Sequence, residues 1–249
     1  MITLNGVAAG YEKLSVLSDI HAVLPQGALT GIIGPNGSGK STLLKTICGL
    51  LPAINGEIQI DGENIHALSR RKRAQLMAFL PQMRITPDLT VEELVSHGRY
   101  PYLGAKRSLS AADWKCVDLA LERTQTLPFR DHLLSRLSGG ERQRAYLAML
   151  LAQDAPHMLL DEPTTYLDPA SQFELMALLR NLAEENRAVA VVLHDLPLAL
   201  HYCHQLIVLD QGRITAQGTP EELILSGALE AVFHVHLHQP GDGFYAISK

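Results

Sequence analysis

Short apolar runs alternate along the chain with longer segments whose apolar residues recur at helical spacing. Residues 29–33, 157–160 and 188–193 are continuously apolar, which is typical of parallel strands buried on both faces, whereas residues 206–215 indicate a strand and a hairpin. A glycine-rich turn and a helical segment follow the first run. The pattern predicts an α/β core.

Helix-start signals define two further elements of this core. Asp168 precedes leucines spaced at i, i+3, i+4 and i+7, and Thr219 opens a capping box near the C-terminal end. Residues 84–136 lack buried-strand runs and contain a helical segment that begins after Ser110. We therefore expect this stretch to be a helical subdomain inserted into the α/β core.

Composition excludes several classes of protein. The 249 residues are 47% hydrophobic and 19% charged, unlike a disordered, collagen-like or coiled-coil chain. The net charge of -5 argues against a nucleic-acid partner, and the basic run at 70–73 is expected to be a solvated helix face. The longest apolar run, residues 145–152, is far shorter than the ~20 residues that cross a bilayer, and residues 1–6 show no signal-peptide pattern. Three cysteines without C-x-x-C spacing indicate neither a disulfide framework nor a zinc site, so we expect a reducing cytosol.

Residues 34–41 read Gly-Pro-Asn-Gly-Ser-Gly-Lys-Ser and match the phosphate-loop pattern G-x-x-x-x-G-K-[ST]. They lie between a predicted strand and a predicted helix, the context that this motif requires. Glycines let backbone N–H groups converge on phosphate oxygens, Lys40 reaches the β- and γ-phosphates, and Ser41 can bind Mg²⁺. The sequence therefore predicts a nucleoside triphosphate site.

Polar side chains follow two of the buried runs at the point where each strand ends. Asp161 and Glu162 come after one run and His194 after the next. Parallel strands bring their carboxyl ends to the same edge of a sheet, so these side chains are expected to lie together. Asp161 suits Mg²⁺, Glu162 suits a general base, and Gln82 is expected to reach the metal or the attacking water from a loop.

Residues 137–144 read LSGGERQR and open a helix that presents N–H groups and a hydroxyl to an anion. With this motif the chain resembles an ATP-binding cassette (ABC) ATPase, the motor subunit of an ABC transporter, over its whole length. The resemblance implies a P-loop NTPase fold with a parallel-sheet core, an N-terminal antiparallel β portion and an inserted helical subdomain. It implies one domain, 1–249, in which 1–83 and 137–249 form the core and 84–136 the helical subdomain.

The resemblance also assigns roles to individual residues. ATP binding falls to Tyr11 at the adenine and to Gly34, Pro35, Asn36, Gly37, Ser38, Gly39, Lys40, Ser41 and Thr42 at the phosphates. The signature comprises Ser138, Gly139, Gly140 and Glu141, with Asp168 in the D-loop. Glu162, His194 and Gln82 are the catalytic residues, and Ser41, Gln82 and Asp161 bind Mg²⁺.

The family mechanism implies several partners. A second copy of the chain completes each ATP site with its signature motif, and membrane-spanning permease subunits convert dimer closure into transport. A periplasmic or surface substrate-binding protein acts indirectly, and no nucleic acid takes part. The chain is expected at the cytoplasmic face of the inner membrane, held there by the permease.

The fragments LTVEEL, GRYPY and EPTTYLD most resemble ATPases that drive import of iron–siderophore, haem and cobalamin complexes, with ferric-citrate-type importers nearest. Exporter motors and importers of zinc, manganese or amino acids remain alternatives within transport. Soluble ABC ATPases of repair or translation usually carry a coiled-coil insertion or tandem cassettes, and this chain has neither. Small-molecule kinases do not require an LSGGE motif.

Three histidines near the C-terminal end, His234, His236 and His238, alternate along the sequence. On a strand they would share one face and could bind a metal, but their position at the polar C-terminal edge argues against a metal site.

Overall fold

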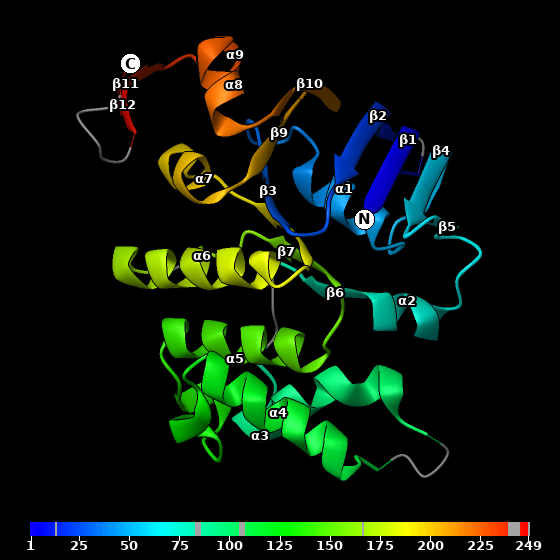
Figure 1. The fold of residues 1–249 in the computed structure, drawn as a ribbon, viewed down its shortest axis with the longest axis vertical. Coiled ribbons are helices and arrows are strands. Elements are labelled where there is room, and N and C mark those ends of the chain that lie inside the picture. Colours follow the sequence, from blue (N-terminus) through cyan, green and yellow to red (C-terminus); the bar gives the residue numbers. More distant parts are fainter. Residues whose placement is uncertain (13, 83–85, 105–107, 166, 239–244, 249) are drawn as a thin grey trace.

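The computed structural model describes residues 1–249 except 13, 83–85, 105–107, 166, 239–244 and 249. The described residues contain a six-stranded sheet in the order β10-β9-β3-β8-β7-β6, in which only β10 runs antiparallel (Figure 1). Its strands are β3 (Ala28–Ile33), β6 (Met77–Leu80), β7 (His157–Asp161), β8 (Ala188–Val192), β9 (Gln205–Asp210) and β10 (Arg213–Gly218). Every residue of β7 and β8 is buried, which confirms the interpretation of the continuous apolar runs.

A second, antiparallel sheet is formed by the N-terminal part of the chain. Its order is β2-β1-β4-β5, and its strands are β1 (Ile2–Tyr11), β2 (Leu14–Leu24), β4 (Ala53–Ile60) and β5 (Glu63–Asn64). Helix α1 (Lys40–Ile47) packs in one apolar cluster with this sheet and with one face of the parallel sheet. The packing fixes α1, and with it the preceding loop, against both sheets.

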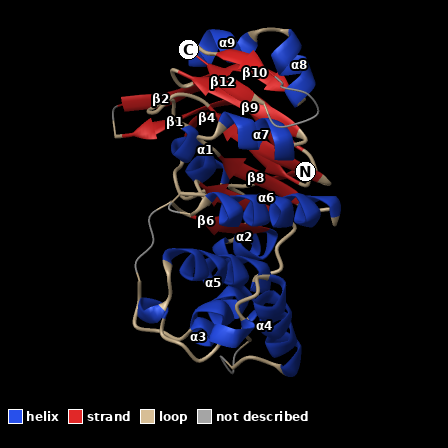
Figure 2. Cartoon of the chain, turned by 90° about the vertical axis from the view of Figure 1, so that its left-hand side faces the viewer, coloured by secondary structure: helices blue, strands red, loops and turns tan. Residues whose placement is uncertain are grey.

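The helical segments between β6 and β7 gather on one side of the molecule, away from both sheets (Figure 2). They are α3 (Val91–Ser96), the 3-10 turn η1 (His97–Tyr102), α4 (Ala111–Arg123), η2 (Leu127–Phe129), η3 (Leu134–Arg136) and α5 (Gly139–Ala152). The predicted helix after Ser110 is confirmed, with a complete capping box. The signature helix α5 packs mainly against α3 and α4, so it belongs to the helical side of the molecule.

The remaining helices are α2 (Arg70–Leu76), α6 (Pro169–Glu184), α7 (Leu196–Tyr202), α8 (Pro220–Leu225) and α9 (Ala228–Phe233). Asp168 caps α6 and Thr219 caps α8, as predicted. Within the described part of the chain, no helix combines the length and the apolar character that crossing a membrane requires.

The three alternating histidines do not share a strand. His234 ends α9 with a left-handed φ of 54°, and strand β11 (His236–His238), which pairs with β12 (Ala246–Ser248), begins only after it. Among the described residues no group of three metal-ligating side chains comes together. The expectation of one shared face is therefore wrong for His234.

Candidate active site

The glycine-rich loop connects the end of β3 to the start of α1. Gly34 and Gly39 have φ values of 152° and 104°, a backbone region that L residues rarely adopt. A Cβ atom on Gly34 would lie 1.9 Å from the carbonyl oxygen of Leu209 on β9. The loop therefore needs glycine there to approach the sheet, and it delivers the N-terminal N–H groups of α1, which favour an anion.

Lys40 is buried inside the curve of this loop. Its Nζ donates hydrogen bonds to the carbonyl oxygens of Gly34 (2.8 Å) and Pro35 (2.9 Å). Burial lowers the pKa of Lys40, and the nearby negative charges of Glu162 and Asp161 oppose that shift. The ammonium is thus held at the loop with two carboxylates near it.

Ser38 provides a direct sign that the loop fits a ligand with acceptor oxygens. Its Oγ is buried and has no hydrogen-bond partner within the part of the chain that the structure describes. A buried hydroxyl without a partner costs free energy, which a phosphate oxygen at the loop would recover.

Ser41 and Asp161 come together from α1 and the end of β7. Ser41 Oγ donates to Asp161 Oδ1 over 2.9 Å. Asp161 is 2% exposed, and burial raises its pKa, while the hydrogen bond from Ser41 opposes the shift. A hydroxyl and a buried carboxylate are hard oxygen donors of the kind that Mg²⁺ prefers, so this pair fits the expected metal.

Glu162 is the centre of a small hydrogen-bonded group. Its Oε1 forms an ion pair with His194 Nε2, while Oε2 accepts hydrogen bonds from Gln82 Nε2 (2.5 Å) and Thr165 Oγ1 (3.3 Å). Glu162 also has a positive φ of 50°, which is uncommon for a residue with a side chain. The expectation that His194 and Glu162 share one sheet edge is confirmed, whereas Thr165 was not predicted.

Part of the phosphate loop lines one pocket of about 200 Å³ together with Glu162 and His194. Its lining residues are Val16, Asn36, Gly37, Gly39, Lys40, Ser41, Thr42, Glu162 and His194. Val16, on β2, was not predicted, because nothing in the local pattern distinguishes it from other strand residues. Tyr11 ends β1 and is 45% exposed; it is not among the described residues that line this pocket. The pocket therefore unites the phosphate loop with Glu162 and His194, while Asp161 and Gln82 join it through their hydrogen bonds with Ser41 and Glu162.

The signature motif lies elsewhere in the chain. Ser138 and Glu141 form a capping box at the start of α5, and Gly140 lines a separate cleft of about 320 Å³ with Leu167 and Ser171. Among the described residues that line the phosphate-loop pocket, none belongs to the signature. One chain thus presents its signature at a different place from its own phosphate loop.

Two glutamines connect the signature helix and α6 to the segment after Glu162. Buried Gln143 on α5 donates to the Pro163 carbonyl over 2.5 Å. Gln172 on α6 donates to the carbonyls of Thr164 and Leu167, next to Asp168, which caps α6 by accepting from Ser171. Neither glutamine could be predicted from the sequence, because both donate to backbone carbonyls, which no residue type marks.

The fold and this pocket define a P-loop nucleoside triphosphatase. A family model described as ABC transporter matches residues 17–165. The chain belongs to the ABC transporter family and is one of its ATP-binding subunits.

Three comparisons support this assignment. The chain is 39% identical over 246 residues to the probable siderophore transport system ATP-binding protein of Bacillus subtilis (strain 168), covering 98% of this chain and 90% of the relative. It is 42% identical over 226 residues to the ferric enterobactin transport ATP-binding protein of Escherichia coli (strain K12), covering 90% and 83%. A structure described as the dimeric structure of a bacterial ABC transporter cassette matches with a TM-score of 0.78 at 30% identity, covering 88% of this chain and 99% of that chain.

Proposed function

We propose that this chain is the ATP-hydrolysing motor of an importer for a ferric siderophore or a related iron chelate. The convergence of Lys40, Ser41, Glu162 and His194 on one pocket, with Asp161 bound to Ser41 behind it, supports the ATPase assignment. The cargo follows from the siderophore and ferric enterobactin transport relatives, which match nine-tenths or more of this chain. A haem or cobalamin complex is the alternative cargo.

In this function each residue of the pocket has a separate task. Lys40 and Ser38 bind phosphate oxygens of ATP, and Ser41, Asp161 and Gln82 hold Mg²⁺, which when bound neutralises charge on the phosphates. Glu162 accepts the proton of the attacking water, and the ion pair with His194 keeps its carboxylate oriented. Tyr11, exposed at the end of β1, stacks on the adenine.

Two copies of the chain are needed for a complete site. The signature residues Ser138 to Glu141 lie away from the chain's own pocket, so they contact the ATP bound by a second copy. The core of 1–83 and 137–249 carries the nucleotide, and the helical subdomain of 84–136, on which the signature helix α5 packs, faces the permease. The permease holds the chain at the cytoplasmic face of the membrane, a substrate-binding protein acts only through it, and nucleic acid has no part.

Glu162→Gln tests the chemistry and the transport role together. We expect ATP hydrolysis to fall by about 10²–10⁴-fold while ATP still binds, because the amide cannot accept the proton. The matched control is Glu184→Gln, which changes an exposed glutamate on α6. Hydrolysis at the wild-type rate in Glu162→Gln would remove the general-base assignment.

The cargo is tested by uptake in cells that lack the gene. Uptake of labelled ferric chelates, haem and cobalamin is measured after complementation with the wild type or with Glu162→Gln. Loss of uptake of one ferric chelate, restored by the wild type but not by Glu162→Gln, supports the proposal. Unchanged uptake of all substrates contradicts the chelate assignment and leaves the ATPase chemistry to be matched to whichever membrane protein co-purifies.

A further inference from the structure

Arg99 is the second residue of the fragment GRYPY, and its side chain is nearly buried, with 10% exposed. Its Nε donates to Asp113 Oδ1 in the first turn of α4 over 3.0 Å. A second guanidinium nitrogen donates to the carbonyl oxygen of Ala152, the last residue of α5, over 2.8 Å. The guanidinium also lies 4.0 Å from the ring centre of Tyr102. Arg99 therefore joins η1 to the ends of two helices.

Gly98, next to Arg99, packs closely against the backbone at the C-terminal end of α5. A Cβ atom on Gly98 would lie 2.3 Å from the Met149 carbonyl oxygen and 2.9 Å from the backbone nitrogen of Gln153. Only glycine lets η1 approach the C-terminal end of α5 this closely. Tyr100, two residues after Gly98, is 55% exposed, so η1 has one face on α5 and one toward solvent.

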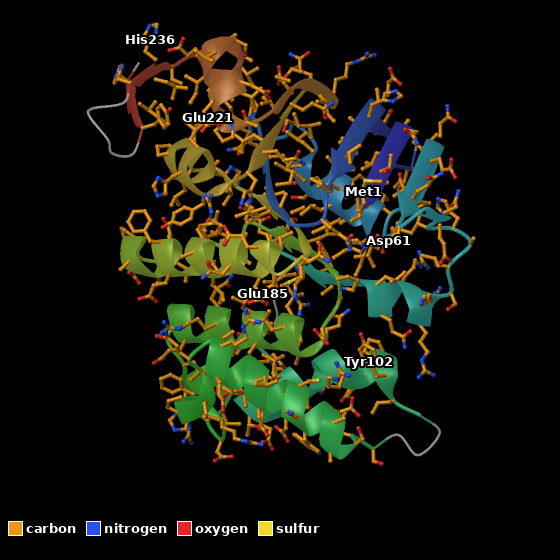
Figure 3. All side chains as sticks on the ribbon, in the orientation of Figure 1. Met1, Asp61, Tyr102, Glu185, Glu221 and His236 are labelled. Carbon is orange, nitrogen blue, oxygen red and sulfur yellow. The ribbon has the colours of Figure 1, made fainter. Side chains whose placement is uncertain are left out.

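The same end of α5 is tied to the start of β6. Gln153 donates through Nε2 to the carbonyl oxygens of Ala74 (2.6 Å) and Met77 (2.8 Å). Helix α2 in turn holds η1, because Arg71 donates to the carbonyls of Pro101 and Leu103. Figure 3 labels Tyr102, which lies in this region beside α2. β6 leads toward Gln82, so the C-terminal end of α5 is a junction between the exposed turn and the nucleotide site.

We propose that Arg99 is a positioning residue that couples the permease-facing turn η1 to the signature helix. A displacement of η1 is carried through Arg99 and Gly98 to the end of α5, and along the rigid helix to Ser138 and Gly140 at its other end. This inference rests on the proposed transport function, because it assigns the displacement to the permease. Among the described residues the contacts of Arg99 are with Asp113, Ala152 and Tyr102, which lie outside the nucleotide site, so it acts on ATP turnover through α5.

The first test measures coupling in the complex with the co-purified permease. Arg99→Gln is expected to keep the basal ATPase rate and the KM for ATP, but to lose about fivefold or more of the stimulation that the permease provides. Arg99→Lys keeps the charge and a donor for the Ala152 carbonyl, so it is expected to keep part of the permease stimulation. Arg130→Gln is the matched control, because Arg130 pairs with Glu92 and Asp118 in the same subdomain but not with η1 or the end of α5. Full stimulation in Arg99→Gln would overturn the proposal.

The second test needs neither permease nor cargo. Hydrogen exchange is followed in the Glu162→Gln background with and without ATP, for peptides that cover η1 and α5. When Arg99 is present, ATP is expected to change the protection of both segments. In Arg99→Gln, ATP is expected to change the protection of α5 alone. A joint response without Arg99 would overturn the inference. If the wild-type complex shows no permease stimulation while this linkage is observed, it is the transport function that fails.

Arg99→Gln removes the cation beside Asp113, which is nearly buried and keeps, within the described part of the chain, only its hydrogen bonds from Ser110, and this loss can weaken the fold by itself. The double variant Arg99→Gln/Asp113→Asn removes that charge while the link to Ala152 stays broken. A purely structural role predicts that the double variant recovers permease stimulation together with its thermal stability. A positioning role predicts that stability recovers and stimulation does not.

Discussion

Glu162 and His194 form an ion pair across the ends of two adjacent parallel strands, through Oε1 and Nε2. Only 11% of the Glu162 side chain is exposed, whereas 43% of the His194 side chain is. The histidine therefore lies on the solvent side of the carboxylate. Because Gln82 and Thr165 bind the other oxygen, His194 is the residue that fixes Oε1.

His194→Ala removes the ion-pair partner of Glu162 Oε1. We expect kcat for ATP hydrolysis to fall by about 10²-fold with little change in the KM for ATP, because the histidine orients the catalytic carboxylate rather than the phosphates. Steady-state phosphate release measures both constants. His66→Ala, at an exposed histidine outside the site, is the control and should match the wild type. A large rise in KM with kcat unchanged would show that His194 serves binding instead.

Gly34→Ala is expected to destabilise the protein before any nucleotide is added. The new Cβ would overlap the Leu209 carbonyl oxygen, so the free energy of unfolding should fall by about 3 kcal/mol or more. Gly27→Ala is the matched control, because Gly27 also has a positive φ of 76° but no atom within 4 Å of its Cβ position. That variant should lose only about 1–2 kcal/mol from backbone strain. Equal losses in urea unfolding would contradict the steric argument.

Composite ATP sites are tested by mixing two inactive chains. Lys40→Ala disables the phosphate loop, and Gly140→Asp places a negative charge in the signature, where a Cβ has room. Heterodimers of the two variants should regain hydrolysis, because one of their two sites keeps an intact loop and an intact signature. Heterodimers of the Lys40→Ala/Gly140→Asp double variant with wild type contain no fully intact site and should stay inactive. Both heterodimers are purified through two different tags, so that wild-type homodimers are removed. Activity in the second heterodimer, or none in the first, would argue against sites completed in trans.

His157 makes stability depend on pH. The ring is fully buried at the start of β7 beside Asp61, which also contacts the Met1 amino group (Figure 3). Burial lowers the pKa of His157 below its usual 6.5, and Asp61 opposes the shift. The unfolded chain thus binds the proton more readily, so stability is fully present above pH 6.5 and is lost as the pH falls toward the depressed pKa.

In His157→Gln the amide still donates to Asp61 but does not titrate. Its free energy of unfolding, measured without nucleotide at about pH 7.5 and about pH 5.5, should fall less on acidification than that of the wild type. His204, whose pKa burial also lowers, stays in both proteins and cancels in the comparison. An identical pH response in the two proteins would show that His157 does not contribute.

The phosphate loop, the acid pair and the capped helices could be predicted because their information is local. The glycines and Lys40 are contiguous, and Asp161 follows a run that is apolar throughout. Arg99 shows the limit of such reasoning. Its burial depends on Asp113 and the end of α5 meeting at one point, which no spacing in the sequence encodes. Thr165 escaped notice for the same reason, since a threonine in a loop gains meaning only from the carboxylate beside it.

The two carbonyl oxygens that hold the Lys40 ammonium have a consequence for the free energy of phosphate binding. They accept two of its three N–H donors, so one donor remains for a phosphate oxygen. The lysine is therefore already oriented before a nucleotide arrives, and its side chain loses little conformational entropy when a phosphate binds. The backbone of the loop thus prepares the cation for its ligand.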